Sequence, residues 1–127
     1  MALGYGPLRE NDPTEFRLSD HGRDTDIGVT IDKTAEDSGN TPTSTLRKGL
    51  VLGKITATGK YAQYDDGAAD GTEVAACILA DRVNLLDEEG TAQDAHSVGV
   101  IHGVVDESKL VGIDANGKAD LKYVIFR

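Results

Sequence analysis

Residues 46–79 read LRKGLVLGKITATGKYAQYDDGAADGTEVAACIL, and the fold is decided in this stretch. The run from Leu50 to Leu52 is apolar at both odd and even positions, which predicts a strand buried on both faces. A turn at Thr58-Gly59 separates it from a second short strand, KYAQY (residues 60–64). After two Asp-Gly turns, the apolar run from Val74 to Ala80 predicts a third and more deeply buried strand.

The flanking segments extend this pattern. TDIGVTI (residues 25–31) is apolar at alternate positions and predicts a strand with one buried face. Residues 32–45 are rich in turn-forming residues and predict a long exposed loop. SVGVIHGVV (residues 97–105) and LKYVIFR (residues 121–127) predict two further strands.

One short helix is expected in DESKLVG (residues 106–112). Asp106 can cap its free N–H groups and Gly112 can end it. The following DANGK (residues 114–118) is interpreted as a turn. These features predict a mainly β fold: a small β-barrel or sandwich domain with one short helix and an extended N-terminal arm.

Composition limits what this domain can be. A chain of 127 residues fits one domain, with 39% hydrophobic residues and no tryptophan. Its core must therefore be built from Val, Ile, Leu and Ala, and a partner or self-association can add stability. The formal net charge of −9 disfavours nucleic acid and anionic membranes as partners. We expect no secretory signal and no membrane-spanning segment, because MALGYGPLRE lacks both a basic and an apolar region and no run approaches about 20 apolar residues.

The N-terminal segment differs from the rest of the chain. We assign residues 1–24 to an arm and residues 25–127 to a single β-rich domain. The arm has no sustained helical or strand period, yet it contains spaced apolar side chains: Leu3, Tyr5, Leu8, Phe16 and Leu18. A segment that docks on a partner has such residues and a purely flexible spacer has few. A disordered terminus of ordinary composition is the alternative.

No residue pattern indicates catalysis, a cofactor or a metal. Asp65, Asp66, Asp70 and Glu73 are four carboxylates within nine residues. Counted from Asp66 as the first ligand, Ala68 and Cys77 fall where an EF-hand loop needs oxygen ligands. We therefore interpret the carboxylates as turn-forming residues. Cys77 lies in an apolar run and is interpreted as a small buried hydrophobe. The three histidines have no zinc-binding spacing.

The order of motifs in residues 46–81 resembles the head decoration proteins of tailed bacteriophages. The matching elements are the strand from Lys48 to Thr56, the segment Gly59–Tyr64, the Asp-Gly loop from Asp66 to Gly71, and the apolar strand Val74–Leu79. VGVIHGVVDESKL (residues 98–110) resembles the second half of that family. One departure is Ala76-Cys77, which stands where a glycine is common.

The resemblance implies a structural virion protein that is not an enzyme. Such proteins bind the major capsid protein on the outer surface of the expanded capsid, as homotrimers, and stabilise it as a cement. The N-terminal arm, with Leu3, Tyr5, Leu8, Phe16 and Leu18, would then contact the capsid, for example by adding a strand to a capsid sheet. Two alternatives remain: a small ligand- or metal-binding β-barrel module, and another virion component such as a tail or fibre protein.

Overall fold

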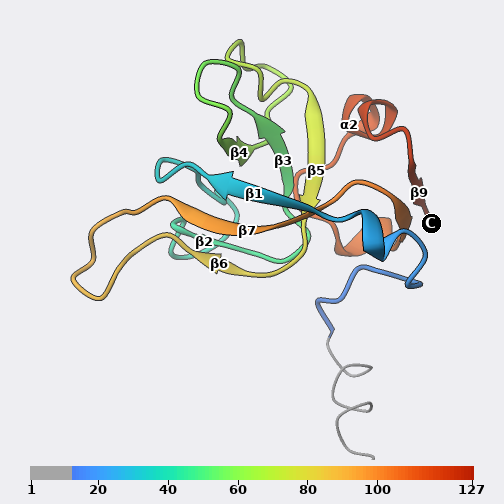
Figure 1. Ribbon diagram of the computed structural model, residues 1–127, viewed down its shortest axis with the longest axis horizontal. Helices are drawn as coiled ribbons and strands as arrows, with labels where there is room; N and C mark the ends of the chain where they lie inside the picture. The colour runs from blue at the N-terminus through green and yellow to red at the C-terminus, as the bar shows by residue number, and fades with distance from the viewer. Residues whose placement is uncertain (1–12) are drawn as a thin grey trace, which may run out of the picture.

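The structure, a computed structural model, describes residues 13–127. Strands in the order β1-β4-β3-β5-β7 close into a barrel, while β2 pairs with β6 and β8 pairs with β9 (Figure 1). The prediction of a mainly β fold with a small barrel is therefore confirmed. The elements are η1 (Arg23–Thr25), β1 (Ile27–Ile31), β2 (Thr45–Leu46), β3 (Val51–Lys54), β4 (Tyr61–Gln63), β5 (Ala75–Leu79), β6 (Val83–Asn84), β7 (Ala95–Val100), β8 (Gly103–Val105), η2 (Glu107–Lys109), α2 (Ala115–Asp120) and β9 (Val124–Phe126).

Residues 46–79 provide three adjacent barrel strands, because β3 lies between β4 and β5 and is antiparallel to both. The barrel closes through β1 and β7, which run antiparallel from Ile27 opposite Gly99 to Ile31 opposite Ala95. Ile31 also pairs with Tyr61 of β4 in parallel. The long β6–β7 connection extends from the end of the barrel that lies away from the C-terminus (Figure 1).

Two hydrophobic clusters explain why the central strands are apolar at successive positions. Leu52 and Cys77 belong to a cluster that also contains Val29, Ile31 and Leu79. Their strand neighbours Val51 and Ile78 belong to a second cluster, formed with residues from β8, β9 and the position after α2. Both faces of β3 and β5 are thus covered, as the apolar run from Leu50 to Leu52 predicts.

The segment 97–105 is not one continuous strand. It divides into β7, which stays in the barrel, and β8, which pairs in parallel with β9. Gly103, at the start of β8, has a φ of 150°. Parallel neighbours need a crossover connection, and η2 and α2 lie within it. This departure places β8, β9 and the C-terminus together at one end of the molecule (Figure 1).

The α-helix was expected in the wrong place. Asp106 does cap a helical segment, accepting from Ser108 N, but that segment is the single 3-10 turn η2 and it ends before Gly112. The α-helix is α2, in the stretch expected to be a turn, where Asp114 accepts a hydrogen bond from Gly117 N. Tertiary contacts favour this helix: Tyr64 donates its hydroxyl to Asp114 at 2.8 Å, and Ala75 N donates to Asp120 at 3.0 Å.

The loop of residues 32–45 is partly buried, contrary to the expectation of a fully exposed loop. Ala35 and Asp37 are 2% and 1% exposed. The Asp37 carboxylate accepts hydrogen bonds from Arg47 N, Nε and Nη2 at 3.1, 2.7 and 2.9 Å. These bonds from Arg47 hold the pKa of the Asp37 carboxyl below its usual range, although burial acts in the opposite direction.

The substitution Asp37→Asn should therefore destabilise the fold in a pH-dependent way. It keeps the side-chain volume but removes the charge that Arg47 binds, which we expect to cost about 2–3 kcal/mol at neutral pH. Because the folded-state pKa of Asp37 is lowered, its contribution is present above the unfolded-state pKa of about 3.9 and declines as the pH falls further. The melting temperatures of the variant and the wild type should differ at pH 7 and converge toward pH 3. A difference that does not change over this range would exclude the charge as its cause.

Candidate functional site

Residues 15–26, named here the docked segment, connect the N-terminal part of the chain to β1. Phe16 is fully buried in the second hydrophobic cluster. Its carbonyl accepts a hydrogen bond from Asp106 N at 2.7 Å, and Leu18 N donates to Val104 O at 2.9 Å. Arg17 pairs with Val105 in an antiparallel bridge. The segment therefore adds to the edge of β8 and is part of the folded body.

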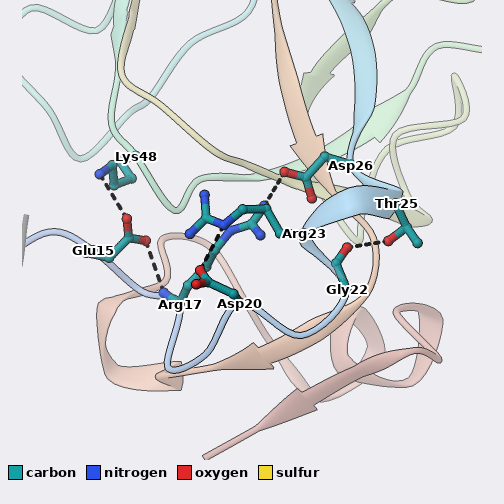
Figure 2. A network of polar contacts seen from close by, with 8 residues as sticks. All are labelled: Glu15, Arg17, Asp20, Gly22, Arg23, Thr25, Asp26 and Lys48. Atoms are coloured by element: carbon teal, nitrogen blue, oxygen red, sulfur yellow. Dashed lines mark hydrogen bonds and ion pairs between the residues drawn. The ribbon is translucent and has the colours of Figure 1, made fainter.

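A buried ion pair fixes the two ends of the docked segment. Figure 2 shows the Arg17 guanidinium reaching Asp26, immediately before β1, and their side chains are 6% and 16% exposed. Removing one partner of a buried pair usually costs about 3–5 kcal/mol, because the other charge is left without a partner. The Asp26 Oδ1 atom is buried and accepts no hydrogen bond in the described part of the chain. This pair therefore fixes the position of the docked segment more than it adds to the net stability of the fold.

Glu15 joins the docked segment to the barrel. Its carboxylate accepts a hydrogen bond from Arg17 N at 3.1 Å and forms an ion pair with Lys48 Nζ at 3.5 Å (Figure 2). A second ion pair, between Arg23 and Asp20, is largely exposed and contributes about 0–1 kcal/mol. Glu15 is thus held beside the β2–β3 connection.

The turn that reverses the docked segment lies against the backbone of His102, immediately before β8. Gly22 has a φ of 83°, and a Cβ atom there would lie 2.5 Å from the carbonyl oxygen of His102. A side chain at this position would therefore be strained and would clash. The His21 ring contacts the His102 ring edge-to-face, with the centroids 4.8 Å apart, and His102 contacts Tyr123 in a similar way.

The structure separates the five predicted contact residues. Leu3, Tyr5 and Leu8 lie outside the described residues. Phe16 is in the protein's own core, whereas Leu18 is 52% exposed. An isolated phenylalanine in an aperiodic segment has no local signal of burial. The run SDHGRD (residues 19–24) is an indirect indication of burial, because a turn there brings residues 16–18 back beside the domain.

The ion pairs of Arg17, Asp26 and Lys48 were not expected from the sequence. They join residues from the docked segment and from the β2–β3 connection, and no spacing in the sequence indicates them. They border a surface hollow of about 430 Å³. Among residues 13–127, positive and negative side chains line it in equal number: Arg17, Arg23 and Lys48 with Glu15, Asp26 and Asp81. A balanced network of this kind supports an element's position and contains no nucleophile with an adjacent base.

Three of the four carboxylates at residues 65–73 form turn contacts, as predicted, whereas Asp66 accepts from Asn116 Nδ2 of α2 at 3.0 Å. Asp65 accepts from Gly67 N at 3.0 Å, and Asp70 accepts from the N–H and hydroxyl of Thr72. Gly71 has a φ of 112°, which suits glycine. Within residues 13–127, no group of three or more His, Cys, Asp or Glu side chains is placed to hold a metal. Cys77 is fully buried, and burial raises the pKa of its thiol to about 12.

Metal removal should leave stability unchanged. The carboxylates of Asp65 and Asp70 already accept backbone N–H groups, so they need no cation to be satisfied. Addition of a chelator, or of calcium in excess, should not shift the melting temperature. A calcium-dependent rise of many degrees would show that a cation binds the folded state and would overturn the turn interpretation.

Comparison with known families identifies the fold's relatives. Residues 22–122, well over half of the chain, match the family model described as bacteriophage lambda head decoration protein D. The chain belongs to this family. The resemblance predicted from residues 46–81 is therefore confirmed, and head decoration proteins are structural proteins of the phage virion that associate with the capsid. No curated protein matches the chain.

Membership in the head decoration family indicates where in the virion this protein lies. The family description specifies the head of the virion, which favours this interpretation over a tail or fibre component. The matched range begins at Gly22, so Phe16 and the earlier residues of this head decoration protein lie before it. In the part of the chain that the structure covers, no helix is long and apolar enough to span a bilayer.

Proposed function

We propose that the protein binds the outer surface of the expanded phage capsid through its N-terminal segment and stabilises the shell without catalysis. Its partner is the major capsid protein, and it acts as a homotrimer. Leu3, Tyr5 and Leu8 provide the apolar contacts, and exposed Leu18 extends them. Phe16 is excluded from this set because it is buried in the core.

The docked segment is the observation that supports this proposal most directly. A contact made by residues 1–12 can transmit force to the barrel only through the residues that follow. Those residues are held by a buried aromatic side chain, a pairing with β8 and the buried pair of Arg17 and Asp26. A flexible linker would need none of these contacts. A capsid contact that must resist force needs a rigidly held segment behind it.

The alternative of a ligand-binding barrel has less support. Fully buried side chains of Ile31, Leu52 and Leu79 pack together in the first cluster. Ligand-binding barrels keep a cavity where these side chains lie. Binding at the surface of another protein therefore fits this barrel better than binding a small molecule inside it.

Pelleting with emptied capsids tests the proposal. The protein should sediment with expanded capsids at a fixed number of copies per shell and should bind unexpanded shells much more weakly. A protein that increases the stability of the expanded shell must bind it better than the alternative states. Equal binding to both forms would contradict the proposed function.

A further inference from the structure

A second hollow, of about 550 Å³, lies beside the start of the described chain. Three connections meet there: the one between β2 and β3, the one between β5 and β6, and η2 with the residues after it. Val111 N donates a backbone hydrogen bond to Gly49 O at 2.9 Å, which holds the first and third connections together. Pro13 and Thr14 also line this hollow, so the N-terminal segment enters the described structure along its edge.

The charge of this hollow is opposite to that of the protein. Among residues 13–127, four lysine and arginine side chains line it but only one acidic side chain, Asp81, does so. We call it the cationic groove. Its basic residues are Arg47, Lys48, Arg82 and Lys109. Elsewhere the chain is strongly acidic, so the groove is where a negatively charged partner meets the least repulsion.

Two of these cations form ion pairs within the described residues and two do not. Arg47 binds the Asp37 carboxylate, and Lys48 forms an ion pair with Glu15. Arg82 and Lys109 are exposed, and no carboxylate among residues 13–127 lies within ion-pair distance of either. Placing like charges together does not stabilise a fold. Their position is instead suited to a partner.

We propose that the cationic groove binds a carboxylate-bearing segment of the capsid subunit, with Arg82 and Lys109 as its principal charge contacts. This rests on the proposed function. Pro13 and Thr14 line the groove, and in the sequence they directly follow the segment that contains Leu3, Tyr5 and Leu8. Arg47, fixed by Asp37, offers its remaining N–H donors at the same groove.

Charge reversal with a matched control tests this assignment. The test variant is Arg82→Glu with Lys109→Glu. The control is Lys54→Glu with Lys122→Glu, because these two lysines are also exposed and do not line the groove. Both double variants have the same net charge. Since all four side chains are exposed, both should keep the wild-type melting temperature.

Binding to emptied, expanded capsids is then measured over a range of salt concentrations. We expect the groove variant to bind about ten-fold or more weakly at low salt and to lose most of the salt dependence, while the control changes little. If the wild type binds and the groove variant matches it at every salt concentration, the groove assignment is wrong and the proposed function stands. If the wild type itself does not bind, both are wrong.

A short double-stranded DNA serves as a probe for general attraction to anions. The wild type should not bind it at physiological salt, because the surrounding surface is acidic. If the wild type binds this DNA and the groove variant does not, while both bind capsids equally, the groove attracts anions in general and the assignment to a capsid segment is overturned.

Discussion

Deletion of residues 2–12 should abolish capsid binding while the barrel stays folded. Leu3, Tyr5 and Leu8 are removed, and burying each such side chain at an interface stabilises it by about 1.5–3 kcal/mol. We expect a loss of at least about a hundred-fold in affinity, which corresponds to about 2.7 kcal/mol. Pelleting with expanded capsids measures the affinity, and thermal melting measures the fold.

A longer deletion, of residues 2–24, is the informative comparison. It also removes Phe16 and Arg17, which belong to the folded body. Loss of a buried phenylalanine costs about 3–5 kcal/mol, and Asp26 is left without its partner. This variant should melt at a much lower temperature or fail to fold. Equal melting temperatures for the two deletions would show that the docked segment contributes nothing to stability. Wild-type binding by the shorter deletion would exclude the N-terminal contact.

The different outcomes for Phe16 and for the central strands show what a single sequence can predict. At Val51 and Leu52 the apolar pattern is local, so burial of both faces of β3 follows from neighbouring residues alone. Phe16 is buried because the next residue, Arg17, pairs with Val105, nearly ninety positions away in the chain. No window around Phe16 contains that information, so it was grouped with residues expected to contact a partner.

The position of the α-helix and the grouping of the charged residues also depend on contacts between residues that are distant in the sequence. Asp106 and Asp114 both have a side chain that can cap a helix, and both do so. Only the second cap continues into an α-helix, because Tyr64 and Ala75 from the barrel bind Asp114 and Asp120. The cationic groove likewise combines residues from three connections that are far apart in the sequence, so no local stretch indicates it.

Particles that lack the protein should assemble but lose their DNA at a lower temperature or after osmotic shock. Each bound copy needs to contribute only a few kcal/mol, because many copies act together on one shell and rupture must break their contacts jointly. Its influence is limited by how much better it binds the expanded shell than broken or unexpanded forms. The net charge of −9 suits a protein on the solvent side of the shell, away from packaged DNA.

Release of DNA on heating, with and without added protein, measures the effect. Adding back the wild type should restore resistance, whereas the variant without residues 2–12 should not, because it folds but does not bind. If bare particles withstand heat and shock as well as decorated ones, stabilisation is not the role of this protein, and a display or attachment role explains its presence better.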